Sequence, residues 1–440
     1  MNTETPQTIL VTVHALDYEG RGVARVNGKT VFIEGALPLE TVSARIVQRK
    51  SHFDEAQTQT IIKPTASRIT PACRHYQDCG GCALQHAEFS AQVAHKQRIF
   101  EEQLQRLGKV FPAQILPPLY GAAWGYRNRT RLTVRLPENS KTAHIGFLGK
   151  RSKRVVHLHE CPVLHPTLSG SLKTLHDFVM QHTQSDINAI ELATADQAAY
   201  VNFITRNTLP KKALQQLSSS LNALNTADWQ IWQQQGKKAI LSTPKNAPPL
   251  AYKLPEFGLH IPFQPNDFTQ VNQALNEIMV SRAVRLLDVK PHEKVADLFC
   301  GLGNFSLPLA KTGARVLGLE GSPELTSRAT HNARANGIHN ANFVTTDLFQ
   351  TTPKTLATWG KFDKMLLDPP RAGAWEVVQS LHAPFLPQKI AYVSCNPATF
   401  ARDAAILVQK GYRFQAAGIM NLFAQTAHIE AIGVFELISQ

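Results

Sequence analysis

The chain has 440 residues, 43% of them apolar, and its 46 Lys and Arg against 33 Asp and Glu give a formal charge of +13. This length predicts two or three domains, each with its own core. The N-terminus has no secretory pattern, no apolar run is long enough to span a bilayer, and six cysteines are too few for a disulfide scaffold, so we expect a cytoplasmic protein. Such a basic chain favours nucleic acid as a partner, although the charge could also serve solubility alone.

The first 65 residues have the pattern of short strands. Five stretches that end near residue 62 are β-branched or alternate in polarity, with turns marked by Gly20, Gly22, Gly28 and Gly35. Five short strands in this length predict a small barrel of the oligonucleotide-binding type. Residues 17–25, which read Asp-Tyr-Glu-Gly-Arg-Gly-Val-Ala-Arg, together with 31–33 and 36–40, resemble the TRAM domain. The resemblance implies RNA binding, and the alternative is a barrel with a structural role only.

The middle region, residues 66–265, begins with clustered cysteines. Cys73, Cys79 and Cys82, together with the distant Cys161, make four soft ligands, a set that fits a structural zinc or an iron–sulfur cluster. Mixed strand and helix signals, including a helix near 86–108, predict an α+β domain. Basic residues follow the cysteines and predict either a face for RNA phosphates or a solvated strand face: Arg127, Arg129, Arg131, Arg135, Lys150, Arg151, Lys153 and Arg154.

From residue 266 to the C-terminus, apolar runs of strand length alternate with helix-length segments, which predicts a parallel, doubly wound α/β sheet. The first run ends at Asp297 and leads into Gly301 and Gly303, where the backbone can approach a ligand closely. The next two runs end at Glu320 and near Asp347, placed to bind ribose hydroxyls and an adenine amino group. Only two glycines of the three-glycine dinucleotide motif are present, which favours S-adenosylmethionine over a nicotinamide or flavin.

Two later motifs carry candidate reacting groups. Cys395 follows an apolar strand in residues 394–397 (Ser-Cys-Asn-Pro), at the sheet edge where ligands bind, and the alternative is a buried inert thiol. Residues 368–371 read Asp-Pro-Pro-Arg, without the Asn and the aromatic residue typical of enzymes that methylate exocyclic amines. Residues 423–430 offer two candidate bases, His428 and Glu430, and residue chemistry alone does not choose between them.

One cysteine and one base suit methylation at carbon 5 of uracil. That carbon is too weak a nucleophile to take a methyl group until a thiolate adds at carbon 6. A base must then remove the carbon 5 proton so that the thiolate can leave. The chemistry therefore needs the two groups on opposite sides of a flipped-out base.

Residues 297–305, 368–371, 394–397 and 423–430 together resemble the RNA uracil-5-methyltransferases, and their rRNA-modifying members in particular. The resemblance implies that Cys395 is the nucleophile and Glu430 the general base. It implies S-adenosylmethionine contacts at Gln270, Phe299, Asn304, Glu320, Asp347 and Asp368. It also implies a [4Fe-4S] cluster on Cys73, Cys79, Cys82 and Cys161. Ala424 stands where the family motif has proline.

The resemblance covers nearly the whole chain and implies three domains: a TRAM domain at 1–65, a mixed α+β iron–sulfur domain at 66–265 and a Rossmann-like methyltransferase domain at 266–440. We expect C5-methylation of a uridine in 23S rRNA by a monomer, with no membrane and no protein partner. The alternatives are another rRNA position, a tRNA, or a non-catalytic RNA-binding iron–sulfur protein. Arg371 stands where related cytosine-5 enzymes have a second cysteine, which favours uracil.

Overall fold

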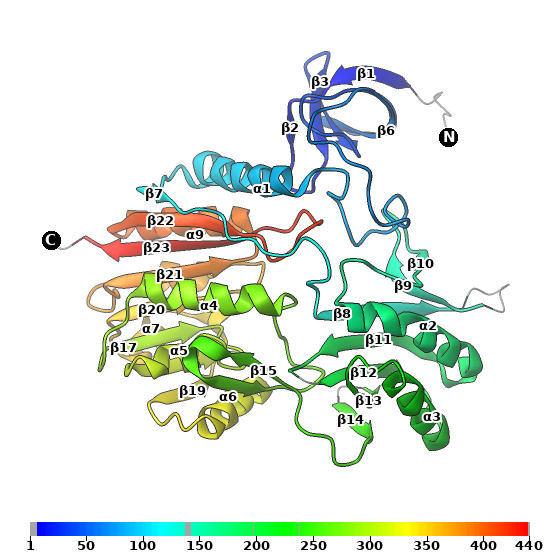
Figure 1. Ribbon diagram of the computed structural model, residues 1–440. Helices are drawn as coiled ribbons and strands as arrows, with labels where there is room; N and C mark the ends of the chain where they lie inside the picture. Colours follow the sequence, from blue (N-terminus) through cyan, green and yellow to red (C-terminus); the bar gives the residue numbers. More distant parts are fainter. Residues whose placement is uncertain (1–6, 137–141, 197, 237, 439–440) are drawn as a thin grey trace.

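The computed structural model describes residues 7–136, 142–196, 198–236 and 238–438. The chain forms three main sheets, which are an N-terminal sheet, a central sheet and a large C-terminal sheet (Figure 1). Among the helices described, none combines the length and the apolar character needed to cross a membrane.

The N-terminal sheet has the strand order β1-β5-β6-β4-β3-β2. Its strands are β1 (Thr8–Thr12), β2 (Ala15–Leu16), β3 (Gly22–Val26), β4 (Lys29–Glu34), β5 (Thr41–Arg49) and β6 (Phe53–Lys63). The first extended stretch, residues 8–16, is interrupted near Val13. Its first part, β1, pairs with β5, and its second part, β2, pairs with β3. The two ends of the sheet are therefore consecutive pieces of chain, and no ladder between them closes a complete barrel among the described residues.

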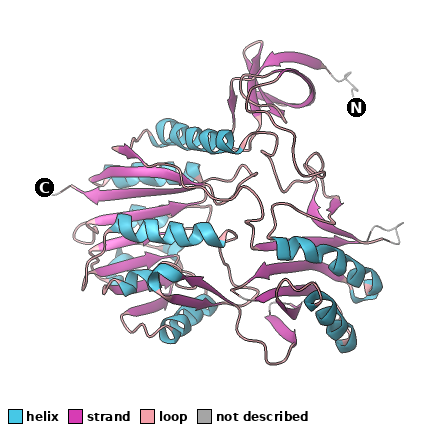
Figure 2. Cartoon of the chain, in the orientation of Figure 1, coloured by secondary structure: helices cyan, strands magenta, loops and turns pink. Residues whose placement is uncertain are grey.

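The central sheet packs two helices on one face (Figure 2). Its order is β10 (Val155–His157), β9 (His144–Leu148), β8 (Arg129–Arg135), β11 (Ile187–Thr194), β12 (Ala198–Thr205), β13 (Asp228–Gln235) and β14 (Lys238–Thr243). The helices are α2 (Pro166–Gln181) and α3 (Lys211–Asn222), and their apolar sides share one core with alternate residues of β11 and β12. This is the mixed α+β unit that the sequence predicts.

The first helix of the middle region packs on the C-terminal sheet. Helix α1 (Phe89–Gln103) continues as a π-helical turn, Leu104–Gly108, and Phe100 lies 5.4 Å from the Phe400 ring, centroid to centroid. Shortly afterwards β7 (Gln114–Ile115) joins the edge of that sheet beside β22 (Tyr412–Met420). The chain thus contacts the C-terminal sheet before it forms the central sheet.

The C-terminal sheet has the order β19-β18-β17-β20-β21-β23-β22-β7. Its other strands are β17 (Lys294–Leu298), β18 (Arg315–Glu320), β19 (Ala341–Thr345), β20 (Lys364–Leu367), β21 (Lys389–Ser394) and β23 (Glu430–Leu437). The hairpin β15 (Ala251–Leu254) and β16 (Leu259–Pro262) precedes them. Helices α4 (Gln273–Leu287), α5 (Ser306–Lys311), α6 (Pro323–Ala335), α7 (Pro353–Trp359), α8 (Trp375–Ser380) and α9 (Pro397–Gln409) complete the layers.

Neighbouring residues of the central strands enter two different cores, as a sheet covered on both faces requires. Val295 and Ala391 belong to the core shared with α4 and α5, whereas Ala296 and Tyr392 belong to the core shared with α1, α8 and α9. The strands β17 to β21 are parallel and β23 is antiparallel to β21. The order of the parallel strands reverses at β17, between β18 and β20, and ligands bind at the carboxyl ends of strands at such a reversal.

Candidate active site

The loop after β17 has the backbone shape of a ligand-binding turn. Phe299, Gly301 and Gly303 have φ angles of 63°, 54° and 89°, and a non-glycine residue at positive φ is uncommon outside functional sites. Glu320 accepts the Gly301 N–H at 3.1 Å and the Ser322 N–H at 3.0 Å, so its carboxylate is fixed beside the loop. A Cβ built on Gly301 would meet nothing within 4 Å, which leaves one face of the loop open to a ligand.

Strand register brings three of the predicted cofactor residues to one level. Leu298 pairs with Leu319 and with Leu367, so that Phe299, Glu320 and Asp368 each lie one residue beyond a paired position. Farther along the edge, Asp347 accepts the Phe349 N–H at 3.0 Å. The rings of Phe299 and Phe349 lie 5.7 Å apart, centroid to centroid, next to this turn.

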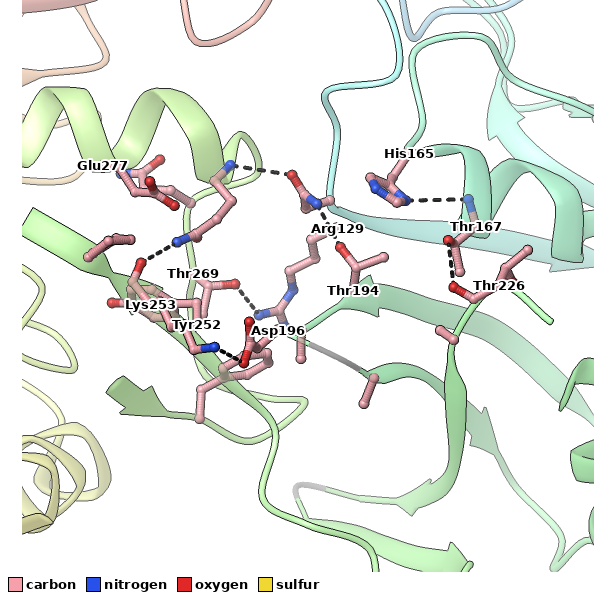
Figure 3. Close-up of a pocket in the computed structure, with 18 residues that line it drawn as sticks. Arg129, His165, Thr167, Thr194, Asp196, Thr226, Tyr252, Lys253, Thr269 and Glu277 are labelled. Atoms are coloured by element: carbon pink, nitrogen blue, oxygen red, sulfur yellow. Dashed lines mark hydrogen bonds and ion pairs between the residues drawn. The ribbon is translucent and has the colours of Figure 1, made fainter. Parts of the chain in front are cut away.

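The other two predicted cofactor residues, Asn304 and Gln270, both lie in the surroundings of Tyr252. The Asn304 side-chain oxygen accepts the Tyr252 hydroxyl at 2.9 Å and the Asn276 amide at 3.0 Å. Tyr252 and Gln270 line a cavity of about 430 Å³ between the central sheet and α4 (Figure 3). Asn304 is therefore held firmly in place by neighbours that sequence reasoning did not find.

Arg129 holds the segment that carries Gln270. Its guanidinium donates to the backbone carbonyls of Pro265 and Asp267. It also donates, at 3.4 Å, to the Thr269 hydroxyl (Figure 3). The Asp267 carboxylate is itself 3.1 Å from Arg328 on α6. The prediction that the alternating arginines form one face for RNA phosphates is therefore wrong for Arg129, because its donors are committed to this segment.

Cys395 and Glu430 face each other across two paired strands. Ser394 of β21 pairs with Ala431 of β23, so the next position along the ladder places Cys395 opposite Glu430. Glu430 is 3% exposed and Cys395 is half-buried. Asp368 lies at the end of the adjacent strand β20. The predicted nucleophile, the predicted base and one predicted cofactor residue thus meet at one edge.

Burial dominates the electrostatics of this edge. It raises the pKa of Asp368 to about 7, and it raises the pKa of Glu430 well above the usual range, with the Asp368 charge adding to the effect. Burial and then the charges of Glu430 and Asp368 raise the pKa of the Cys395 thiol to about 11, while Arg371 opposes them. These shifts favour the protonated forms, and positive charge brought into the site would favour the thiolate and the carboxylates.

His428, the other candidate base, has a different position. It is exposed, and its Nδ1 lies 2.7 Å from the Arg371 guanidinium. Partial removal of water from the ring and the Arg371 charge lower the pKa of His428 to about 4 although the residue remains exposed, so its ring is neutral near pH 7. The ring lies with Arg371 on the wall of the cavity in front of Cys395.

The loop that leads to Glu430 is held by residues more than 290 positions away. Buried Lys96 of α1 donates to Asn421 Oδ1 at 2.7 Å and to the Phe423 carbonyl at 2.8 Å. The Tyr126 hydroxyl donates to the Ala424 carbonyl at 2.7 Å, which fixes the position where the family motif has proline. Ala83 and Leu84 donate their N–H groups to the Gln425 carbonyl at 2.9 and 3.0 Å.

A cavity of about 370 Å³ opens in front of Cys395. The N-terminal sheet contributes Tyr18 and Glu19, and the cysteine segment contributes residues 80–83. Arg371, Asn396, Pro397 and residues 426–429 form the catalytic side. All three parts of the chain therefore border the space beside the nucleophile.

The four clustered cysteines lie near one another, two buried and two half-buried. Burial, and to a lesser degree the charges of neighbouring thiols, raises the pKa of Cys79, Cys82 and Cys161. Within the described part of the chain, no group of three or more His, Cys, Asp or Glu side chains has the geometry to hold a metal ion. The four thiols predicted to bind a [4Fe-4S] cluster are thus close together but do not have metal-binding geometry.

Comparison with known proteins agrees with this geometry. The model of the tRNA (uracil-5-)-methyltransferase family matches residues 89–437, and that of the TRAM domain matches residues 3–58. The chain belongs to the tRNA (uracil-5-)-methyltransferase family. It is therefore a methyltransferase, and the predictions of a TRAM domain and a Rossmann-like catalytic domain are confirmed.

Individual members of this uracil-5-methyltransferase family match over nearly their full length. The 23S rRNA (uracil(1939)-C(5))-methyltransferase RlmD of Neisseria lactamica is 48% identical over 97% of this chain and 95% of its own. The enzyme of the same name from Thiobacillus denitrificans is 46% identical over 97% and 99%. The solved structure of Pyrococcus abyssi tRNA (uracil-54, C5)-methyltransferase with S-adenosyl-L-homocysteine has a TM-score of 0.74, 23% identity and coverage of 97% and 99%. This last likeness shows a shared fold.

Proposed function

We propose that this enzyme transfers a methyl group from S-adenosylmethionine to carbon 5 of a uridine in 23S rRNA, at the position named for its relatives, uracil 1939. The observation that carries the proposal is the buried Glu430 opposite Cys395 at the ends of paired strands, beside an open cavity. Identity of 46–48% to two 23S rRNA enzymes along the whole chain, TRAM domain included, supports rRNA over tRNA.

In the proposed reaction the Cys395 thiolate adds to carbon 6 of the uracil, and the ring electrons move onto the carbonyl at carbon 4 as an enolate. When bound, S-adenosylmethionine would supply an electrophilic methyl group, which carbon 5 attacks, and S-adenosylhomocysteine would be the leaving group. Glu430 then takes the carbon 5 proton, and the returning electrons expel the Cys395 thiolate. Arg371 lowers the pKa of Cys395. It therefore favours the thiolate both when Cys395 attacks carbon 6 and when it is expelled at the end of the reaction.

Glu430 suits the base better than His428 does. A carboxylate with a raised pKa is a stronger base than an ordinary one, whereas His428 has a lowered pKa and lies with Arg371. We assign the cofactor contacts to Gln270, Phe299, Asn304, Glu320, Asp347 and Asp368. Support comes from the open face of the loop at Gly301 and from the fixed Glu320 carboxylate beside it.

An adduct experiment tests these roles. With RNA that carries 5-fluorouridine at the target, the wild-type protein and S-adenosylmethionine should form a covalent complex, because fluorine cannot leave as a proton would. Cys395→Ala should form none, whereas Cys300→Ala, which removes the other cysteine of residues 266–440, should still form it. Glu430→Gln should trap an adduct with ordinary RNA. An adduct on Cys395→Ala, or full turnover by Glu430→Gln, would contradict the assignment.

We further propose that Cys73, Cys79, Cys82 and Cys161 hold a [4Fe-4S] cluster. The four thiols lie close enough to influence one another's pKa, and four neighbouring cysteines are the ligand set that such a cluster takes. Protein purified without oxygen should contain about four iron and four sulfide per chain and absorb visible light. Zinc in place of iron would overturn the proposal.

A further inference from the structure

The turn between β2 and β3 brings an aromatic ring from the N-terminal sheet to the catalytic cavity. Tyr18 is 62% exposed, yet it lines the cavity of about 370 Å³ that also contains Cys395. The only hydrogen bond described for its side chain runs from the hydroxyl to Glu19, at 3.3 Å. A large exposed ring beside a nucleophile has a face free for a planar ligand.

The turn that carries Tyr18 is rigid. Asp17 accepts the N–H groups of Glu19 at 3.0 Å and Arg21 at 2.8 Å, and the Arg21 guanidinium binds its second oxygen at 2.8 Å. Gly20 has a φ of 81°, a left-handed conformation in which side chains are disfavoured. These contacts fix the turn before any ligand arrives, which lowers the entropy cost of binding.

The same turn is fixed relative to the catalytic loop. Gly20 packs directly on Leu84, in the segment after the clustered cysteines. A side-chain Cβ at position 20 would come within 3.0 Å of Leu84 Cδ2. Leu84 in turn donates its N–H to the Gln425 carbonyl at 3.0 Å, in the loop that leads to Glu430. The position of Tyr18 is thereby set with respect to the reacting groups.

A second cavity continues the path beyond the turn. It measures about 410 Å³ and shares Glu19, Gly80, Cys82 and Ala83 with the first. It leads past Arg21 toward Lys150 and Arg151. Space on both sides of the turn suits a strand that continues past a nucleotide held at Cys395.

We propose that Tyr18 stacks on a nucleobase adjacent to the target uridine and so sets the affinity for RNA. The inference rests on the proposed function. A uridine can reach Cys395 only when it leaves its stack, and its neighbours then lose a stacking partner. Aromatic side chains supply such faces to unstacked bases in RNA-binding proteins.

Fluorescence of 2-aminopurine tests the contact directly, in the full-length protein with Cys395→Ala to prevent turnover. RNA fragments carry the probe on either the 5′ or the 3′ side of the target uridine. With Tyr18 or Tyr18→Phe, binding should quench the probe in one of the two RNAs, and with Tyr18→Ala the quenching should be lost. Quenching in neither RNA, or equal quenching with Tyr18→Ala, would overturn the proposal.

Kinetics in the active enzyme separate this inference from the proposed function. Tyr18→Ala should raise the KM for RNA about 10-fold, with kcat and the KM for S-adenosylmethionine within about twofold. Phe111→Ala is the matched control, because Phe111 is 69% exposed and lines neither cavity. If Tyr18→Ala left the KM for RNA unchanged, the stacking role alone would be contradicted. If the wild-type enzyme transferred no methyl group to RNA, the proposed function would be contradicted.

Discussion

At the scale of single residues, the buried carboxyl of Asp297 makes the free energy of unfolding depend on pH. It is fully buried at the end of β17, and the Ser306 hydroxyl donates to one of its oxygens. Burial raises its pKa from 3.8 to about 7. Between these values the folded protein keeps a proton that the unfolded chain releases, so this group makes the free energy of unfolding fall as the pH rises from about 4 to about 7.

Asp297→Asn should remove that dependence. We expect the wild-type protein to lose on the order of 4 kcal/mol more unfolding free energy than the variant between pH 4 and pH 7, as denaturant titrations at each pH would measure. Asp228→Asn, at an exposed carboxyl, serves as the control. Parallel pH curves for the wild type and Asp297→Asn would show that Asp297 is ionised in the folded protein.

At the scale of elements, α1 acts on the catalytic loop through one buried amine. Lys96 is 1% exposed, and burial lowers its pKa to about 7. Its two acceptors, Asn421 and the Phe423 carbonyl, precede Glu430. A neutral hydrogen bond contributes about 0.5–1.5 kcal/mol and one from a charged group about 1.5–3 kcal/mol, so this amine helps to fix the loop in either protonation state.

Lys96→Met should therefore lower kcat about 10-fold while the KM for RNA stays within about twofold, because the loop loses two donors but the RNA-facing cavity keeps its walls. Steady-state kinetics measure the split. Arg98→Met, an exposed position on the same helix, should leave both constants unchanged. A rise in KM without a fall in kcat would place Lys96 in RNA binding instead.

Strand β8 offers a second element-scale test, because two of its arginines differ in role. Arg129 binds two carbonyls and a hydroxyl of the segment before Gln270, whereas Arg131 pairs on the surface with Glu191 at 3.2 Å. Lysine lacks the planar fork that reaches several acceptors. Arg129→Lys should raise the dissociation constant for S-adenosylmethionine several-fold in calorimetry, and Arg131→Lys should not. Equal affinities would remove Arg129 from the cofactor site.

Local patterns account for what the sequence predicts well. The bounds of α6 are encoded within a few residues: Ser322 caps the helix by accepting the Leu325 N–H, Pro323 begins it and Gly337 follows its end at positive φ. The apolar runs of β17, β20 and β21 likewise specify buried strands. The insertion of antiparallel β23 between β21 and β22 leaves no local signal, although it is what brings Glu430 to Cys395. The same holds for Lys96 and Arg129, whose partners lie more than 130 residues away.

At the scale of the whole molecule, the N-terminal domain packs on the middle region of the chain through a small apolar cluster and several ion pairs. Leu16 and Leu37 of the N-terminal sheet pack with Leu84 and Ala87. Lys150 and Arg151, which sequence analysis considered for RNA phosphates, pair instead with Glu34 at 3.6 and 3.7 Å. The apolar part of this contact packs the N-terminal sheet, and with it the turn that carries Tyr18, against the middle region.

Leu37→Ala should therefore weaken RNA binding without touching the chemistry. Leu37 is fully buried and belongs to the docking cluster, separate from the core of the N-terminal sheet, so its truncation leaves a cavity at the contact that costs about 2–5 kcal/mol. The turn with Tyr18 would then lose its fixed position, and the KM for RNA should rise several-fold while the dissociation constant for S-adenosylmethionine stays at its wild-type value. Leu10→Ala, at an exposed leucine of β1, controls for truncation within the same sheet. If Leu37→Ala left the KM for RNA unchanged, the N-terminal domain would contribute nothing to substrate binding through its docked position.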